Sequence, residues 1–567
     1  MTPAALRFVF GVAQVERSGG SRIDRHCPPS GLWVICSLPI VVRAGSDVRI
    51  LSFKPGHDGS VALLDGGKLI FALEAEKDSF PRYAEVTPSV VLDAMSLCDE
   101  IPDAVCLSGW VKGFHSVERS LNAGYFGWDE STVEVGSTTI FGRPVAMFSS
   151  THERSHLMSA YGLSPFAQGT PCYALVWEGN IGSFYEMTAD GRIVRLAQVL
   201  EDPGNKYQFA FALADPAVPE GPPAFRFENA GKMMALTAFA DGADASDEER
   251  RLIDFILSQE SILLGTPKSS VRWSPFHNAG VETQSFKNLA AHLSDAIFDR
   301  FAATARQLLT EGYPLLVSGG CGLNCSWNSR WQETGLFADV FVPPCTNDTG
   351  SAIGTAVDAQ RHFTGDAKIT WSVYAGAEFV IDTAVEDYRS RPLDLDEVAG
   401  LLADGLVLGW VQGRYEMGPR ALGNRSLLAA PFDAAMRDRL NKIKGREGYR
   451  PIAPVCREEE MSTHFAGRSD SPYMLHFQEV RTPRLAAVTH VDGSARVQSV
   501  RRDQNAVLHD LLSAFHRRTG IGVLCNTSLN FRGRGFINRM SDLAEYAQDR
   551  DLDGFVVEDR LYLIRPA

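Results

Sequence analysis

Residues 49–64, RILSFKPGHDGSVALL, indicate the architecture of the chain most directly. Two apolar runs flank a Pro-Gly-His-Asp-Gly segment, which predicts a strand, a tight turn and a second strand. Asp65, Gly66 and Gly67 predict another tight turn before the strand-like run KLIFALEAE. His57 and Asp58 are therefore expected at the tip of the first hairpin.

Two glycine-rich turns occur later in the chain. PLLVSGGCGLN, residues 314–324, predicts a buried strand that runs into a glycine-rich turn before a helix. Such a turn lets backbone N–H groups approach a nucleotide. NDTGSAIGTAVDAQ, residues 347–360, repeats the pattern and places Asp348 just ahead of a helix. Strands alternating with helical stretches from 48 to 365 predict an α/β fold.

The run GWVQGRYEMGPRALGNRS, residues 409–426, sets three arginines beside glycine turns. Arg414, Arg420 and Arg425 predict an anion site, because the guanidinium fork matches phosphate and carboxylate oxygens. The alternative is a solvated loop that happens to be basic. Further cations and turn-forming polar residues lie downstream and favour a polyanionic small substrate such as ATP or an acyl phosphate: Lys444, Arg446, Arg450, Arg496, Asn526, Ser528 and Asn530.

Composition is that of a globular protein that can bury a large core. Hydrophobic residues make up 45% and charged residues 22% of the 567 residues, a length that implies two or three domains. The net charge of −14 disfavours nucleic acid or an anionic membrane as the main partner. No apolar run is long enough to span a bilayer. The ten cysteines show no CxxC spacing, which favours reduced thiols and a cytoplasmic location.

Residues 1–47 differ in character from the rest of the chain. They carry scattered arginines, a Pro-Pro pair at 28–29 and no clear periodicity. A GTG start codon at Val48 would explain the change, whereas a signal peptide would need a small-residue cleavage site that is not evident. We expect this extension to be disordered or wrongly assigned, and dispensable.

Several motifs in order give the chain a resemblance to the NodU/CmcH carbamoyltransferase family: FKPGHDGSVALL, HERSH at 152–156, VSGGCGLNCSWN at 317–328, NDTGSAIG, and the arginine and CNTSLN segments. The resemblance covers nearly everything from residue 48 onward. It implies an actin/hexokinase-type ATPase-like domain at 48–365, a linker at 366–391 and a YrdC-like α/β domain at 392–567. The C-terminal domain would form carbamoyl adenylate.

A metal site is suggested by His152 and His156, because i, i+4 spacing on a helix places both imidazoles on one face. Taken alone, this spacing is more often coincidence or a surface pair. The family resemblance implies a divalent metal, with iron as the expected ion, and adds Asp348 and Glu178 as ligands. Glu178 departs from the family pattern, since relatives carry aspartate at that position.

His57 and Lys232 each have a structural and a functional interpretation. A histidine in a turn is more often structural or solvated, but the resemblance implies that His57 is the base that deprotonates the acceptor hydroxyl. Relatives have a basic run after their acidic stretch, whereas EAEKDSFPRYAE leaves only Lys77 and Arg82 as nearby cations. Lys232 is either a solvated helix residue or a contact to nucleotide phosphates.

The resemblance implies a two-stage reaction in which carbamoyl phosphate and ATP, with magnesium, give carbamoyl adenylate in the C-terminal domain. The adenylate would then react at the N-terminal site with the hydroxyl of a small-molecule natural product, a polyketide or a cephem. A homodimer is also possible by this resemblance. The nucleotide would contact Gly319, Gly320, Gly322 and Asn324, and the carbamoyl phosphate would contact Arg420, Lys444, Arg450, Arg496 and Ser528.

Two other function classes remain open. A tRNA threonylcarbamoylation protein would share both domain types, but it would need a basic surface for RNA, against the acidic balance of this chain. A non-catalytic nucleotide-binding sensor would keep the glycine turns and lose the phosphate-binding cations. Acceptor-dependent release of pyrophosphate would separate both from a carbamoyltransferase.

Overall fold

A computed structural model describes residues 48–112, 121–221 and 227–564. The predictions made for residues 1–47 lie outside these ranges. In the described ranges, no helix is both long and apolar enough to cross a membrane.

The first sheet has six strands in the order β3-β2-β1-β4-β6-β5. Its antiparallel start is the predicted one, β1 (Arg49–Lys54), β2 (Ser60–Asp65) and β3 (Lys68–Glu74). Gly66 and Gly67 turn between β2 and β3 with φ of 55° and 77°, which suits a two-residue hairpin. Parallel pairing then adds β4 (Ala104–Ser108) and β6 (Arg143–Ser150), and β5 (Glu134–Ile140) closes the edge. Helix α1 (Pro88–Ser96) precedes β4.

The second sheet repeats this topology, in the order β11-β10-β7-β8-β9. Three antiparallel strands, β7 (Cys172–Trp177), β8 (Gly182–Met187) and β9 (Ile193–Gln198), are followed by β10 (Leu315–Ser318) and β11 (Val340–Phe341), both in parallel pairing. Two sheets with one topology are the structural duplication of the actin/hexokinase-type fold. The predicted fold class of residues 48–365 is therefore confirmed by the strand order.

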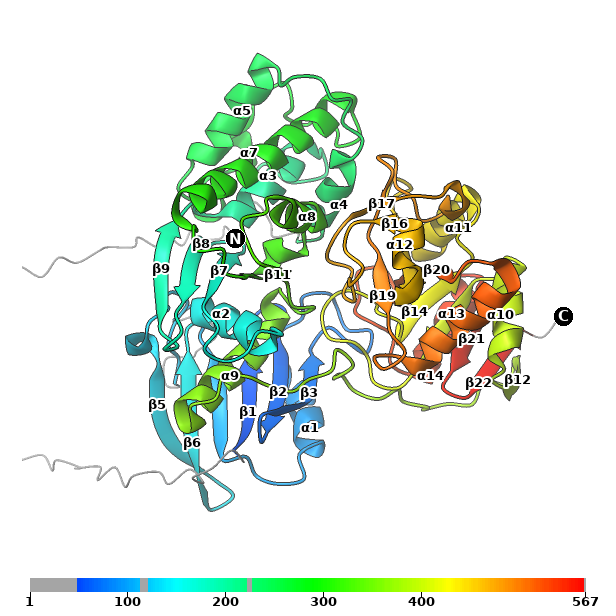
Figure 1. Ribbon diagram of the computed structural model, residues 1–567, viewed down its shortest axis with the longest axis horizontal. Helices are drawn as coiled ribbons and strands as arrows, with labels where there is room; N and C mark the ends of the chain where they lie inside the picture. The colour runs from blue at the N-terminus through cyan, green and yellow to red at the C-terminus, as the bar shows by residue number, and fades with distance from the viewer. Residues whose placement is uncertain (1–47, 113–120, 222–226, 565–567) are drawn as a thin grey trace, which may run out of the picture. The chain divides into compact units, whose positions relative to one another are not determined.

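Helices α2 (His152–Leu163) and α9 (Ser351–Thr364) pack against each other between the two sheets (Figure 1). The close approach depends on Gly354 of α9, because a methyl group there would collide with the carbonyl oxygen of Ser155. The second sheet is covered on its other side by a largely apolar helical layer: α3 (Pro203–Ala214), α4 (Glu228–Thr237), α5 (Asp247–Ser258), α6 (Ile262–Gly265), α7 (Gln284–Leu308) and α8 (Cys325–Glu333). Residues 49–364 are called the two-sheet part below.

The C-terminal part, residues 388–564, is built on a mixed sheet of eight strands in the order β12-β22-β21-β13-β14-β20-β15-β19. Their bounds are β12 (Tyr388–Pro392), β13 (Leu408–Val411), β14 (Arg425–Ala429), β15 (Ala453–Arg457), β19 (Gln498–Val500), β20 (Val523–Ser528), β21 (Gly554–Val557) and β22 (Arg560–Ile564). A small sheet adds β16 (Phe465–Ala466), β17 (Gln478–Val480) and β18 (Ser494–Ala495). This is the α/β C-terminal domain class that was predicted.

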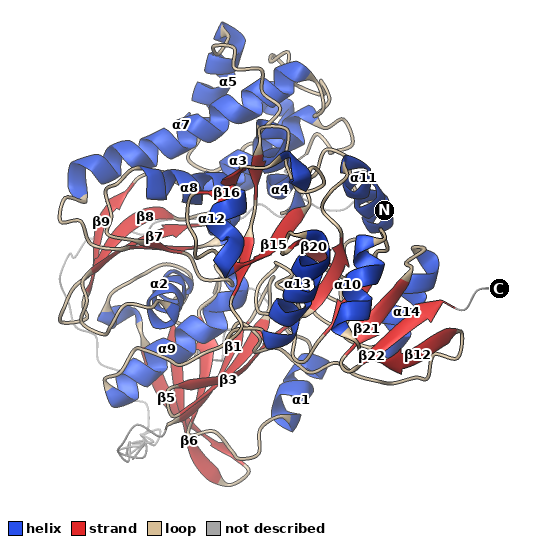
Figure 2. Ribbon diagram, turned by 45° about the vertical axis from the view of Figure 1, so that its right-hand side comes forward, coloured by secondary structure: helices blue, strands red, loops and turns tan. Residues whose placement is uncertain are grey.

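Helices cover both faces of the eight-stranded sheet. On one face α10 (Leu395–Ala403) and α13 (Ala506–Thr519) lie side by side over Leu428 and its neighbours (Figure 2). On the other face Leu427 joins an apolar core with α11 (Ala434–Lys444), α12 (Met461–His464) and α14 (Met540–Asp549). Strand alternation explains why neighbouring leucines enter opposite cores.

The segment between the two parts is hydrogen-bonded to both of them. Thr370 and Ala375 accept hydrogen bonds from the backbone of β3, at 2.9 and 2.8 Å. Gly376 then donates to the carbonyl of Tyr415 at 2.9 Å, within the arginine motif. The connection is therefore a strap that runs from the first sheet to the loop between β13 and β14. This loop carries Arg414 and Arg420 and is called the anion-site loop below, after its predicted role.

Candidate active site

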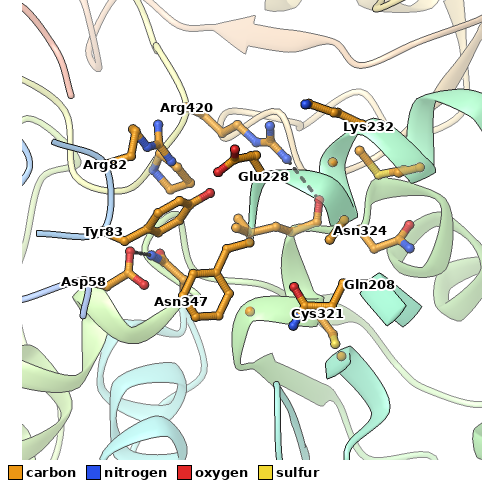
Figure 3. A pocket seen from close by; sticks show the side chains of 18 of the residues that line it. Asp58, Arg82, Tyr83, Gln208, Glu228, Lys232, Cys321, Asn324, Asn347 and Arg420 are labelled. Atoms are coloured by element: carbon orange, nitrogen blue, oxygen red, sulfur yellow. Dashed lines mark hydrogen bonds between the residues drawn. The ribbon is translucent and has the colours of Figure 1, made fainter. Parts of the chain in front are cut away.

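One cavity of about 670 Å³ is lined by residues of both parts of the chain (Figure 3). Most of the predicted site residues lie on its wall: His57, Glu178, Lys232, Gly320, Asn324, Asp348, Arg420, Lys444, Arg450, Arg496 and Ser528. Four other predicted site residues do not line the cavity: His152, His156, Gly319 and Gly322. Residues far apart in the sequence thus converge on a single space.

Lys444 and Ser528 meet at the ends of their elements. Lys444 is the last residue of α11, and Ser528 is the last residue of β20. The lysine Nζ donates to the Ser528 carbonyl at 2.5 Å and lies 3.3 Å from its hydroxyl. Burial, with the charges of Arg446 and Arg450, holds the pKa of Lys444 well below its usual range. Asn530 also accepts hydrogen bonds from the lysine, through its carbonyl at 3.2 Å and through its side-chain oxygen, so Lys444 is held on the cavity wall beside Ser528.

The arginines of the cavity repel one another. Burial and then Arg496 lower the pKa of Arg420 to about 9, and burial and Arg450 lower that of Arg446 to about 9. Arg420 donates to the carbonyl of Leu323 at 3.0 Å, while its Nε has no partner among the described residues. Such a group of clustered cations with few counter-charges would suit a bound polyanion, which would remove their mutual repulsion.

The other two arginines of the predicted motif do not belong to this site. Arg425 is fully buried in β14, where it donates to the carbonyls of Gln412, Gly413 and Asn424. Arg414 donates to two carbonyls of the strap at 2.6 and 2.8 Å. Neither side chain lines the cavity, so the prediction that all three arginines form one anion site is wrong for these two.

The glycine turn after β10 brings its backbone close to neighbouring strands. Gly319 has a φ of 99°, and a side chain there would meet the carbonyl of Trp177 at 2.5 Å. A side chain at Gly322 would meet the hydroxyl of Thr346 at 2.5 Å. Gly320 faces open space on the cavity wall, and Asn324 caps α8 by accepting from the N–H of Ser326 at 3.2 Å. The turn presents backbone and a helix N-terminus to the cavity.

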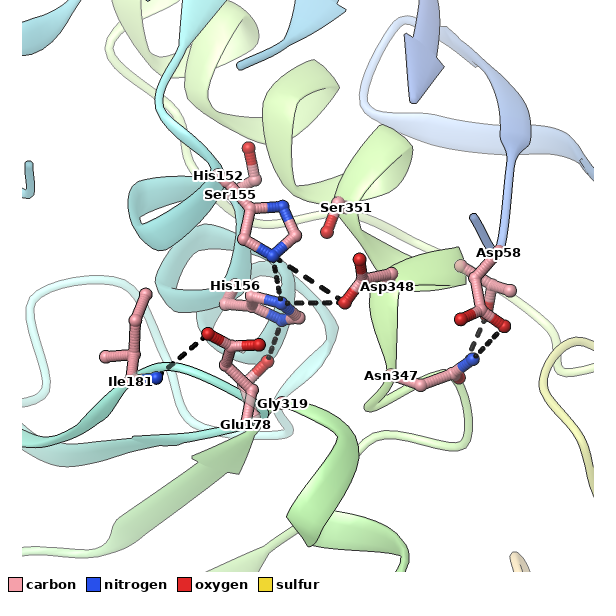
Figure 4. Close-up of polar contacts among 12 residues, drawn as sticks. Asp58, His152, Ser155, His156, Glu178, Ile181, Gly319, Asn347, Asp348 and Ser351 are labelled. Carbon is pink, nitrogen blue, oxygen red and sulfur yellow. Dashed lines mark hydrogen bonds and ion pairs between the residues drawn. The ribbon is translucent and has the colours of Figure 1, made fainter. Parts of the chain in front are cut away.

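His152, His156 and Asp348 form a buried cluster (Figure 4). The two Nε2 atoms are 3.2 Å apart, and Asp348 Oδ1 lies 3.3 Å from His156 Nε2 and 3.6 Å from His152 Nε2. Helix α2 supplies both imidazoles from adjacent turns, as the i, i+4 spacing predicts, and Asp348 comes from the turn before α9. Among the described residues this is the one His/Cys/Asp/Glu group able to share an ion.

The donor set fits a divalent metal. Metal–nitrogen bonds of about 2.1 Å place neighbouring ligand atoms about 3.0–3.4 Å apart, close to the separations in this cluster. His156 Nδ1 lies 3.1 Å from Ser318 Oγ, an arrangement that leaves Nε2 free to bind. Burial, together with His156, keeps the pKa of His152 well below its usual range, so its imidazole is neutral. Two imidazoles and a carboxylate suit zinc, iron or a similar ion.

Lys54 and His57 connect this cluster to the cavity. Lys54, fully buried in β1, contacts Asp348 Oδ2 at 2.9 Å. Although burial opposes it, Lys54 and the adjacent histidines hold the pKa of Asp348 well below its usual range. His57, 36% exposed, has its Nδ1 3.0 Å from Asp58 Oδ2 and its Nε2 3.7 Å from Asp348. His57 therefore faces the cavity with one ring nitrogen held by a carboxylate.

Glu178, which was also predicted as a metal ligand, lies beside the cluster and is not one of the three grouped residues. Its carboxylate accepts hydrogen bonds from the backbone of Asn180 and Ile181 at 3.0 and 2.9 Å, and from the Tyr125 hydroxyl at 3.1 Å. Burial and then the charge of Asp348 raise the pKa of Glu178 to about 7. The structure thus places Glu178 on the turn after β7, outside the His152–His156–Asp348 group.

Sequence reasoning assigned no role in the site to Lys54 or Asn347, and it named Arg82 only as a nearby cation. Lys54 lies in the quoted FKPGHDG motif, but nothing local marks its contact with Asp348. Arg82 and Asn347, unlike Lys54, line the cavity. Asn347 donates to Asp58 at 3.1 Å and so links the first hairpin to the turn before α9. A signal existed only for Asn347, which precedes Asp348 in the second glycine-rich turn.

Comparison with known proteins places the chain in a family. The family models "Carbamoyltransferase N-terminus" and "Carbamoyltransferase C-terminus" match residues 285–357 and 399–563. The 3'-hydroxymethylcephem-O-carbamoyltransferase of Amycolatopsis lactamdurans is 52% identical over 90% of this chain and 99% of its own length. The enzyme of the same name from Streptomyces clavuligerus is 50% identical over 90% and 98%. Nodulation protein U of Sinorhizobium fredii is 32% identical over 88% and 97%.

Solved structures are more distant. HypF in its phosphate- and nucleotide-bound form is 14% identical, covers 58% of each chain and has a TM-score of 0.31. A glucokinase from Streptomyces griseus is 13% identical, covers 55% of this chain and 99% of its own, and has a TM-score of 0.26. The chain belongs to the NodU/CmcH carbamoyltransferase family, on the evidence of its near full-length relatives, and it is an enzyme.

Proposed function

We propose that this enzyme transfers the carbamoyl group of carbamoyl phosphate, through carbamoyl adenylate, to a hydroxyl of a natural product in antibiotic biosynthesis. The acceptor class we favour is a 3-hydroxymethylcephem, since the two relatives at 50–52% identity bear that name. The observation that carries the proposal is the single cavity that holds both the cation cluster and His57.

The cation cluster suits the first half-reaction. With one water, carbamoyl phosphate and ATP give carbamoyl adenylate, pyrophosphate and phosphate. Both reactants are polyanions, and the positive charges offset their repulsion. Magnesium would accompany the ATP phosphates, as it does in phosphoryl-transfer sites generally. The assigned contacts to carbamoyl phosphate are Arg420, Lys444, Arg450, Arg496 and Ser528.

His57 suits the second half-reaction. The acceptor oxygen bonds to the carbamoyl carbon, its proton moves to His57 Nε2, and AMP leaves with the electrons of the broken C–O bond. Asp58 orients the ring through Nδ1, at 3.0 Å. Gly320, Asn324 and Lys232 would hold the nucleotide during this step. An enclosed passage inside the cavity would keep the mixed anhydride from water.

His152, His156 and Asp348 would hold a divalent metal, for which we propose iron. When bound there, such an ion supplies Lewis-acid stabilisation of charge on an oxygen of the reacting group. Glu178 would orient the site from its turn. The free thiols of all eight described cysteines are in keeping with a reducing cytoplasm, where ATP and carbamoyl phosphate are available.

The proposal is tested by incubating the enzyme with carbamoyl phosphate, ATP, Mg²⁺ and a 3-hydroxymethylcephem. We expect the mass of one carbamoyl group on the acceptor and release of pyrophosphate, with neither product when one component is omitted. Hydroxylated polyketides serve as competing acceptors. Modification of tRNA, or nucleotide binding with no turnover, would favour the two alternative classes.

A further inference from the structure

Gly418, two residues before Arg420, is held by side chains of the two-sheet part of the chain. Its N–H donates to Glu74 Oε1 at 2.5 Å, and its carbonyl accepts from Lys77 Nζ at 2.7 Å. Glu74 is the last residue of β3, and Lys77 lies in the next turn of the chain. The backbone N–H and the carbonyl of Gly418 are thus both hydrogen-bonded to side chains of the two-sheet part.

Lys77 is an unusual residue to find in this place. Its side chain is 1% exposed, and it lies 3.1 Å from Glu74 and 3.6 Å from Glu76. The ammonium also lies 3.8 Å from the centre of the Phe536 ring. A lysine that is shielded from solvent needs a counter-charge and acceptors for its N–H groups. The carbonyl of Gly418 is one of those partners.

The anion-site loop is confined on its other sides as well. Gly418 has a φ of 84°, and a methyl group there would collide with the carbonyl of Pro344. Two residues later, the Arg420 guanidinium donates to the carbonyl of Leu323 at 3.0 Å. Pro344 and Leu323 both belong to the two-sheet part. Arg420 therefore takes its position from residues outside the C-terminal part that carries it.

We infer that Lys77 and Glu74 are positioning residues for the carbamoyl-phosphate site, which act by fixing the backbone of Gly418 and so the direction of Arg420. The inference rests on the proposed function in assigning Arg420 to carbamoyl phosphate. The adenylate-forming site is then complete only when the two-sheet part is docked on the arginine motif. Neither Lys77 nor Glu74 lines the cavity.

The test compares Lys77→Met with a matched control, Lys268→Met. Lys268 is 1% exposed and donates to the carbonyls of Asp215 and Val218 at 2.6 and 3.0 Å, but it does not line the cavity. Carbamoyl phosphate binding is measured by calorimetry on the full-length variants. We expect the Kd to rise at least about tenfold in Lys77→Met and to stay within about twofold of the parent in Lys268→Met.

A double-mutant cycle separates positioning from a merely structural role. If Lys77 acts through Arg420, Lys77→Met weakens binding in the parent but adds little in an Arg420→Ala background. Lys77→Gln, which keeps an amide donor, should bind with intermediate affinity, and it replaces Lys77→Met in the cycle if the methionine variant does not fold. Equal weakening in both backgrounds, or unchanged affinity, would overturn the inference.

The same samples distinguish failure of the inference from failure of the proposed function. A parent that binds carbamoyl phosphate but does not exchange pyrophosphate into ATP contradicts the proposed reaction, while the affinity comparison still decides the role of Lys77. A parent that binds no carbamoyl phosphate overturns the inference along with the assignment of Arg420.

Discussion

Arg420 is the side chain whose loss should most directly stop adenylate formation. Arg420→Ala removes a guanidinium held at the cavity by Leu323, a change worth on the order of 2–4 kcal/mol, or about 30- to 1000-fold in rate. Pyrophosphate exchange into ATP measures it. The control is Arg517→Ala, which breaks an exposed ion pair with Asp396 and should have no effect. Parental exchange in Arg420→Ala would refute the assignment of the anion site.

Substitutions of His152 and His57 should affect metal content differently, although both side chains lie beside Asp348. His152→Ala removes one of the proposed metal ligands, so bound metal should fall, whereas His57→Ala should keep it. Both variants should retain pyrophosphate exchange and lose carbamoyl transfer. Elemental analysis beside the exchange assay checks this. Unchanged metal in His152→Ala, or no divalent ion in metal-replete parent protein, would remove the metal from the mechanism.

At the scale of elements, the packing of α2 on α9 holds the histidines beside Asp348. Gly354→Ala would push a methyl group into the carbonyl of Ser155 and separate the helices. We expect it to lower the free energy of unfolding by about 1–3 kcal/mol and to reduce metal content. Gly231→Ala, in α4 with open space around the new methyl, should instead leave unfolding unchanged or stabilise by about 0.5–1 kcal/mol. Thermal unfolding of both variants is the measurement, and equal melting temperatures would count against the packing argument.

For the whole molecule, the shared cavity predicts that the two half-reactions can be uncoupled by filling the space between their sites. Gly231 lines the cavity next to Lys232, which pairs with Glu447 of the C-terminal part at 3.3 Å. Gly231→Trp should keep pyrophosphate exchange and lose most carbamoyl transfer, while Gly231→Ala keeps both. Both activities are assayed on one preparation. Full transfer in the tryptophan variant would mean that the intermediate takes another route.

Local sequence was sufficient for much of the fold. The hairpin at 49–64, the strand and glycine turn around Gly319, and the helix that follows Asp348 could each be predicted, because hydrophobic period and turn residues act over a few positions. The spacing of His152 and His156 likewise predicted one helical face, and α2 carries both. These features depend on residues that are close in sequence, so they can be predicted without a structure.

The tertiary structure alone decided which charged residues share a site. The sequence does not distinguish the three arginines of the motif. Arg414 and Arg425 donate to backbone carbonyls, and of the three only Arg420 lines the cavity. Lys77 meets Gly418 across 341 positions, and no local pattern marks that contact. The order of the motifs was enough to indicate the family by resemblance. The partner of each charge depends on burial and on which segments the two sheets bring together, and those are properties of the folded chain.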